Sequence, residues 1–305
     1  MNPSVNFLGD GLFEAIKEEN SKLRPSLNYT DCHAQVFGSP DVYPTCSEKT
    51  LDINDYIPEQ YSKFCAERDI NNTVLIQPEC YGTDNRCLLS AISILNNDCG
   101  EDAKFQAKGI ARIKYDLEEK ELEELTNAGV IGAKFVMGRG LNGLTWEEAD
   151  KLAWRINDFG WQVELHMDGC DLHEAEKFLK TWPGRMVLPH LGQFQREITT
   201  QQRGFTTLAR LIDRDKAWVK LSAPYILSRD NDLDDPEVTD IIAALVKWAP
   251  ERLVWGTNWP HIEKEGDRSI DERLLELMHK WVPNETTRKL IMCDNPTILY
   301  GFTND

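Results

Sequence analysis

Three histidines and one asparagine stand at the ends of short apolar runs, and their side chains are suited to proton transfer and hydrogen bonding. They are His33, His166, His190 and Asn258. Imidazole titrates near neutral pH, so it can act as a general acid or a general base. If the apolar runs are parallel strands of a barrel, their carboxyl ends meet at one mouth. We therefore predict catalytic roles for these four residues.

Further polar and aromatic side chains lie at or just beyond the same ends. Lys134 and Arg139 are predicted to bind a carboxylate, which arginine can hold through two parallel hydrogen bonds. For Lys134 a place on the outside of the fold is equally compatible with the pattern. Ser222 and Tyr225 can donate hydrogen bonds, and Trp259 can stack on a planar ring. The predicted substrate-binding residues are Gln35, Gln77, Tyr81, Lys134, Arg139, Ser222, Tyr225 and Trp259.

Apolar strand-like runs alternate with amphipathic helical stretches along most of the chain. We expect strands at 28–37, 72–77, 107–113, 130–137, 161–166, 185–190, 217–222 and 253–257. We expect helices at 13–23, 57–69, 85–97, 118–128, 145–159, 171–182, 202–214, 236–248, 270–281 and 285–293. Such alternation indicates parallel strands covered on both faces, and eight strands are the number that closes a (β/α)8 barrel. A doubly wound open sheet is the alternative.

Local patterns add detail to two of these elements. Thr145 is followed three residues later by Glu148, the spacing of a capping box at a helix start. In the first strand, side-chain alternation predicts Asp31, His33 and Gln35 on one side.

Composition limits the classes of partner. The chain has 305 residues, of which 41% are hydrophobic, and a formal net charge of −17, which opposes binding to nucleic acid or anionic membrane surfaces. No apolar window approaches the roughly 20 residues of a membrane span, and no secretory signal is visible. The eight cysteines include no C-x-x-C pair, so we expect reduced thiols. These features predict one cytoplasmic domain over 1–305, with 1–27 as an N-terminal extension, that takes a small-molecule substrate; the oligomeric state stays open.

Four motifs together resemble a known family. They are Asp31-x-His33-x-Gln35-x-Phe37, Leu188-Pro189-His190-Leu191-Gly192, Trp218-Val219-Lys220-Leu221-Ser222 and Trp255-Gly256-Thr257-Asn258-Trp259-Pro260-His261. They resemble the amidohydrolase-2 branch of the amidohydrolase superfamily, and most of all its group of 2-pyrone-4,6-dicarboxylate lactonases and sugar-acid lactonases. The closing segment with Asn295-Pro296 also matches. The resemblance covers about 27–302 and implies a (β/α)8 barrel that hydrolyses lactones of small acidic molecules.

The chain departs from the family pattern at two positions. Gln35 stands where the family usually carries the second histidine of His-x-His, and Asn258 stands where it carries an aspartate that binds metal or acts as general base. An amide does neither well. We therefore predict no catalytic metal, with one Zn or Mn at His33, His166 and His190 as the alternative. Asn258 is either natural or an Asp→Asn change that traps a ligand, and the second departure at Gln35 favours the natural explanation.

The leading hypothesis is a metal-independent hydrolase of lactonase type that acts on a small oxygenated, carboxylated cyclic substrate. In it His190 or His33 activates water, His166 polarises a carbonyl and Asn258 holds the substrate or the water. One alternative is a lyase, isomerase or decarboxylase that uses histidine acid–base chemistry in the same pocket. Another is a catalytically silent barrel that binds a small ligand.

Overall fold

The computed structural model describes residues 29–46, 56–97, 105–137, 143–194, 199–228, 230–264, 267 and 269–303. Eight parallel strands pair in chain order into one sheet. They are β1 (Tyr29–Ala34), β2 (Ile70–Ile76), β3 (Gln106–Ala111), β4 (Val130–Val136), β5 (Gln162–His166), β6 (Met186–Leu188), β7 (Ala217–Leu221) and β8 (Leu253–Trp255).

The sheet closes where β1 meets the residues that follow β8. Ala34 forms a parallel bridge with Trp259. The Gln35 N–H donates to the Trp259 carbonyl at 2.8 Å, and the Asn258 N–H donates to the His33 carbonyl at 2.8 Å. The predicted (β/α)8 barrel is confirmed, and the alternative of an open sheet is wrong.

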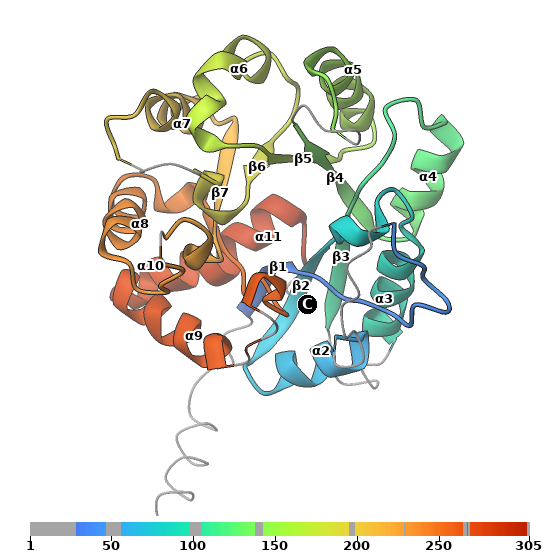
Figure 1. Ribbon diagram of the computed structural model, residues 1–305, viewed down its shortest axis with the longest axis horizontal. Helices are drawn as coiled ribbons and strands as arrows, with labels where there is room; N and C mark the ends of the chain where they lie inside the picture. The colour runs from blue at the N-terminus through green and yellow to red at the C-terminus, as the bar shows by residue number, and fades with distance from the viewer. Residues whose placement is uncertain are drawn as a thin grey trace, which may run out of the picture.

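Helices surround the strands on the outside, except the last one, α11, which lies near the centre of the view (Figure 1) and packs Leu299 and Tyr300 against the barrel interior. They are α2 (Pro58–Ala66), α3 (Arg86–Asn97), α4 (Glu119–Asn127), α5 (Trp146–Asn157), α6 (Leu172–Leu179), α7 (Arg203–Asp213), α8 (Pro236–Trp248), α9 (Ser269–Trp281), α10 (Glu285–Lys289) and α11 (Asn295–Tyr300). The expected capping box at Thr145 and Glu148 is present at the start of α5. The expected single helix at 285–293 is instead α10, a π-helical turn at Leu290–Asp294 and then α11. Pro296, near the start of α11, has no N–H to continue the earlier hydrogen-bond ladder.

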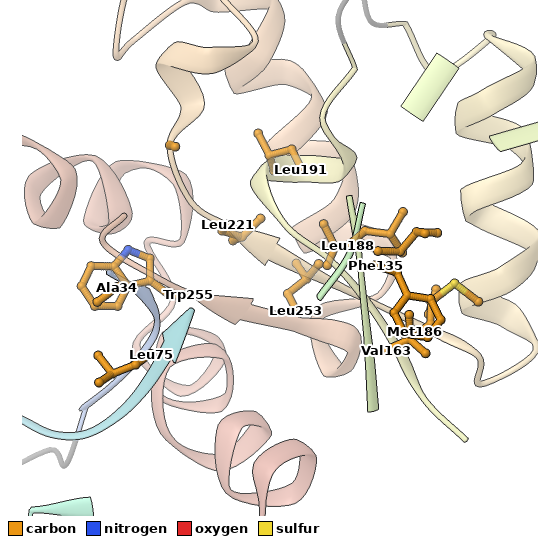
Figure 2. Close-up of a cluster of buried hydrophobic side chains, with 14 of the residues drawn as sticks. Ala34, Leu75, Phe135, Val163, Met186, Leu188, Leu191, Leu221, Leu253 and Trp255 are labelled. Carbon is orange, nitrogen blue, oxygen red and sulfur yellow. The ribbon is translucent and has the colours of Figure 1, made fainter. Parts of the chain in front are cut away.

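Apolar side chains form one layer between strands and helices and another inside the barrel. Figure 2 shows part of the first layer, including Leu75, Phe135 and Leu221. The inner layer joins side chains from several strands to the C-terminal segment: Cys32, Val74, Ile76, Ile110, Val187, Trp218, Val254, Leu299, Tyr300 and Phe302. The C-terminal segment therefore packs against the barrel interior. Among the described residues, no helix is long and apolar enough to cross a membrane.

The side-chain alternation expected in the first strand is wrong for Asp31. The pairing of β1 with β2 shifts register between Asp31 and Ala34, so the regular alternation is broken. The buried Asp31 carboxylate accepts hydrogen bonds from Tyr61 Oη on α2 at 2.8 Å and from Thr257 Oγ1 at 2.6 Å. His33 instead contacts residues of the barrel interior. Asp31 thus joins β1, α2 and the end of β8, and its Oδ1 also accepts the backbone N–H of His33 at 3.0 Å.

Removing the Asp31 carboxylate should weaken this junction. In Asp31→Ala, the buried Thr257 N–H and the Tyr61 and Thr257 hydroxyls lose their acceptor, and each buried donor left without a partner costs about 1–3 kcal/mol. We expect the free energy of unfolding, measured by urea denaturation, to fall by about 3 kcal/mol or more. Asp31→Asn keeps one acceptor oxygen and should lose less. The exposed Asp240 on α8 provides the control, since Asp240→Ala should change it by less than about 0.5 kcal/mol. Equal losses in the Asp31 and Asp240 variants would contradict this assignment.

Candidate active site

Three imidazoles from distant parts of the chain lie together at the carboxyl ends of the strands, which we call the mouth. His33 comes from β1, His166 ends β5 and His190 follows β6. The ring centroids of His33 and His190 are 4.5 Å apart. Glu164 connects the other pair, because its Oε1 lies 2.9 Å from His166 Nε2 and 3.8 Å from His33 Nδ1. The structure therefore brings the predicted histidines to one place.

A buried ion pair between Lys220 and Glu164 lies beside these rings in the barrel interior. Lys220 of β7 donates to the Glu164 carboxylate in a short hydrogen bond and to the Cys32 carbonyl at 2.7 Å. Both side chains are at most 1% exposed. Burial opposes the ionised carboxylate, but the charge of Lys220 and the hydrogen bond from His166 outweigh it and lower the pKa of Glu164 to about 2. Glu164 is thus an anion that orients the imidazole next to it.

The imidazoles are neutral at physiological pH. Burial, together with neighbouring positive charge, lowers the pKa of His33 and of His166, and it lowers the pKa of His190 to about 3. A neutral His166 donates from Nε2 to ionised Glu164, so its Nδ1 is left as an acceptor. Ser222 Oγ accepts the backbone N–H of His190 at 3.3 Å and lies 3.0 Å from its Nδ1. If Ser222 donates its one hydrogen to Nδ1, His190 Nε2 carries an N–H.

Lys220 places a positive charge beside the imidazoles. Lys220 Nζ lies 3.4 Å from His33 Nδ1, where it engages a ring nitrogen and adds a positive charge beside the would-be ligands. In the part of the chain that the structure describes, no three His, Cys, Asp or Glu side chains are arranged to hold a metal ion. A zinc site takes about four donors, most of them anionic or imidazole. The ammonium of Lys220 supplies positive charge to the cluster of Glu164 and the histidines.

Asn258 begins a directional chain of hydrogen bonds. Its Nδ2 donates to Tyr225 Oη at 2.8 Å and to Glu263 Oε2 at 3.2 Å. Tyr225 Oη lies 3.0 Å from His261 Nδ1, and His261 Nε2 lies 2.8 Å from Asp271 Oδ1 on α9. The consistent arrangement has Tyr225 donating to Nδ1 and Nε2 donating to Asp271. Both amide hydrogens of Asn258 are therefore used here, which leaves its carbonyl oxygen as the acceptor available to a ligand.

Lys134, for which an outside place was equally compatible, is buried in the barrel. It pairs in register with Glu164 across β4 and β5. Its ammonium is 3% exposed and lies 2.7 Å from Glu79, which also binds the buried Arg112 at 2.6 Å. These two cations line a cavity of about 540 Å³ together with Cys46, Tyr81, Gly82, Thr83, Asp84, Ile113, Lys114, Tyr115, Asp116, Val136, Gly143, Leu144 and Glu148. Two buried cations beside a cavity favour an anionic ligand.

Gln77 and Tyr81 hold the loop that follows β2. The Gln77 amide nitrogen donates to the Gly82 carbonyl at 3.2 Å and to the Asp84 carbonyl at 2.8 Å. Tyr81 Oη accepts from the Gly38 N–H at 3.1 Å, while its ring lines the cavity. Of these two predicted substrate-binding residues, Tyr81 is the one that borders open space.

Trp259 lies away from the mouth. Its ring packs 5.0–6.3 Å, between centroids, from an outer aromatic cluster formed by Tyr56, Tyr61 and Phe64. Gln35 is half-buried beside it. Arg139 lies outside the described residues, so its predicted role stays a prediction. His261, at the end of the motif that contains Trp259, contacts Tyr225 and Asp271.

Sequence reasoning also missed Glu164, Lys220 and Arg112 as site residues. The signal was present for the first two, because each is a charged residue flanked by apolar ones in a strand expected to be buried on both faces. A charge in such a strand must face the barrel interior and find a partner there. Arg112 follows β3 directly, as the other candidates follow their strands.

Comparison with known proteins gives a family match over residues 30–302, to the model described as amidohydrolase (Amidohydro_2). D-galactarolactone isomerase of Agrobacterium fabrum is 31% identical over 80% of each chain. The 2-pyrone-4,6-dicarboxylate hydrolase of Comamonas testosteroni is 26% identical over 88% of this chain and 89% of its own. The 4-sulfomuconolactone hydrolase of Hydrogenophaga intermedia is 28% identical over 89% and 88%.

Comparison with solved structures agrees with the sequence comparison. A crystal structure from Agrobacterium tumefaciens superposes with a TM-score of 0.78 at 28% identity, over 90% of this chain and 96% of that one. The expected resemblance to the lactonase group is therefore confirmed, and the isomerase among the relatives agrees with one of the alternatives.

Separating the buried ion pair should destabilise the protein strongly. Lys220→Met leaves Glu164 as a buried charge without its cation, and we expect the free energy of unfolding to fall by about 3–5 kcal/mol. Lys220→Met combined with Glu164→Gln removes both charges and should recover much of that loss in urea denaturation. Lys151→Met on the exposed face of α5 is the matched control and should be nearly neutral. A double variant as unstable as the single one would show that charge pairing is not the cause.

The lowered pKa of Glu164 also sets a pH dependence. Since its folded pKa of about 2 lies below the ordinary glutamate value of about 4.3, the pair stabilises the fold above that value and loses its contribution as pH falls toward 2. We expect the unfolding free energy of the wild type to fall between pH 5 and 2 more steeply than that of Glu164→Gln. Parallel curves for the two proteins would contradict the assignment.

Proposed function

The chain belongs to the amidohydrolase family, and on that premise we propose that it is a lactone hydrolase for a small cyclic ester that carries an anionic group, and that it works without a metal. The observation that carries the proposal is the meeting of neutral imidazoles at the mouth with the buried cations Lys134 and Arg112 on the neighbouring strands. A lactone carbonyl needs hydrogen-bond donors as its oxygen becomes negative, and an anionic substituent needs cations.

Glu79 occupies the place that an anionic group of the substrate would take. Its carboxylate is exposed, yet it binds the two buried cations. A carboxylate or sulfonate of the substrate offers the same oxygens and can take the place of this exposed side chain without leaving the cations unpaired. Two of the relatives are named for a dicarboxylate and for a sulfonated lactone, which supports an anionic substrate here.

The hydrogen-bond directions suggest how roles are divided. His190 Nε2–H, fixed by Ser222, is a donor suited to the lactone carbonyl oxygen. His166 Nδ1 and the Asn258 carbonyl oxygen are acceptors suited to the water or to a substrate hydroxyl. This exchanges the roles that the sequence suggested, in which His166 polarised the carbonyl. The ammonium of Lys220 stabilises the anion Glu164 and, through it, the orientation of His166.

An isomerase is the second candidate, favoured by Asn258 and by the isomerase among the relatives. Moving a lactone ring between hydroxyl groups needs proton transfer but no water added to the product. Hydrolysis releases one proton per turnover at neutral pH, because the new carboxylic acid ionises, whereas isomerisation releases none.

The activity test uses a panel of lactones assayed by proton release and by NMR of the products. The panel holds 2-pyrone-4,6-dicarboxylate, 4-sulfomuconolactone, a galactarolactone and the uncharged δ-valerolactone. We expect an anionic lactone to be opened with a kcat/KM at least tenfold above that of δ-valerolactone, and the rate to survive dialysis against EDTA. His190→Phe should lower kcat about 10²–10³-fold through loss of one carbonyl donor. His279→Phe, on the exposed face of α9, is its control.

Each part of the proposal can fail separately. Wild-type protein that opens none of these lactones would contradict the hydrolase, and NMR evidence of a rearranged ring without proton release would establish the isomerase instead. Loss of activity in EDTA with recovery on adding Zn²⁺ or Mn²⁺ would contradict the metal-free reaction.

A further inference from the structure

We propose that Glu263 is the general base of this site, supplying from the turn after β8 the carboxylate that position 258 lacks. The inference rests on the proposed hydrolysis. Glu263 lies in the 3-10 turn Ile262–Lys264, five residues beyond Asn258, and its Oε2 accepts a hydrogen bond from Asn258 Nδ2 at 3.2 Å. A carboxylate is therefore present within one hydrogen bond of the side chain where the family's pattern places its aspartate.

The other groups around Asn258 are poorer bases. Tyr225 Oη accepts a hydrogen bond from Asn258. Burial raises the pKa of the Tyr225 hydroxyl far above neutrality, so it stays protonated and donates its hydrogen bond to His261. Asp271 is buried and already accepts from His261. Glu263 is exposed, so its carboxylate is accessible to water and free to exchange protons between turnovers. The amide of Asn258 holds the carboxylate in place without competing for the proton.

The histidines do not serve better in this role. His190 has a pKa lowered to about 3 by burial, which makes its imidazole no more basic than a carboxylate. His33 is fully buried, and its Nδ1 lies against the ammonium of Lys220. Their geometry suits hydrogen bonding to the substrate, while the exposed carboxylate of Glu263 is in contact with solvent.

The proposed hydrolysis proceeds in two steps. Glu263 takes a proton from water while the water oxygen bonds to the lactone carbonyl carbon, whose oxygen becomes negative beside the His190 N–H. The intermediate then breaks its bond to the ring oxygen, which receives the proton from Glu263. The products are the free hydroxyl and the new carboxylic acid, which ionises in solution. No oxidant, reductant or second substrate is required.

The first test compares Glu263→Gln with wild type on the lactone that the wild type opens best. The substitution keeps shape and removes the base, so we expect kcat to fall at least 100-fold while KM changes less than threefold. Glu272→Gln, an exposed glutamate on the neighbouring α9, is the control for loss of one surface charge and should keep kcat within twofold. Because a carboxylate at 258 occupies the adjoining place, Glu263→Gln combined with Asn258→Asp should regain at least tenfold in kcat.

The outcomes separate this inference from the function on which it rests. A wild type that opens lactones, with Glu263→Gln within threefold of it in kcat, would overturn Glu263 as the base and leave the hydrolase standing. Failure of the double variant to gain over Glu263→Gln would likewise overturn it. A wild type without any lactone hydrolysis would overturn both.

A measurement without turnover checks the placement of the carboxylate. Protein labelled at the glutamate δ-carbon is titrated by NMR, with Glu263→Gln used to assign the resonance. Two carboxylates in hydrogen-bond contact resist joint ionisation, so Asn258→Asp should raise the Glu263 midpoint by at least one pH unit. An unchanged midpoint would show that the two side chains do not meet, and would overturn the proposal.

Discussion

The ion pair of Glu164 and Lys220 is the constraint on which the arrangement of the mouth depends. Two charges inside a barrel each cost several kcal/mol to bury, so they are tolerated only when paired and fully hydrogen-bonded. Glu164 meets this demand by accepting from Lys220 and His166, and Lys220 by donating also to the Cys32 carbonyl. The pair thereby ties β1, β5 and β7 together. It also decides which nitrogen of His166 carries the hydrogen, and so which one is free for a ligand.

The sequence predicted the barrel because apolar strands and amphipathic helices alternate with a period that has few other solutions. It also predicted that His33, His166 and His190 would meet, because carboxyl ends of parallel strands share one edge. It could have identified Glu164 and Lys220 by the same logic, since charged residues in strands covered on both faces must point inward. Composition was the least informative feature, because it argued against nucleic acid and membrane partners but identified no residue of the site.

Side-chain direction beyond the strand ends could not be predicted. Alternation places residues only while the ladder is regular, and the register shift in β1 turns Asp31 toward α2 although it stands two residues from His33. Trp259 was also unpredictable, because it lies beyond the end of β8, where alternation no longer applies. Its ring packs into the outer aromatic cluster. The contact of Asn258 with Glu263 depends on a three-residue turn, which no periodic pattern specifies.

The surroundings of Asn258 suit an amide side chain. Its two N–H groups meet two acceptors, the Tyr225 oxygen and the Glu263 side chain, and the Tyr225 hydrogen is directed away toward His261 and Asp271. An aspartate at 258 would face a second carboxylate at 3.2 Å. The hydrogen bonds run in one direction, from Tyr225 through His261 to Asp271, so the residue that contacts the Tyr225 oxygen at their beginning must be a donor. Asparagine meets that requirement through its Nδ2 group.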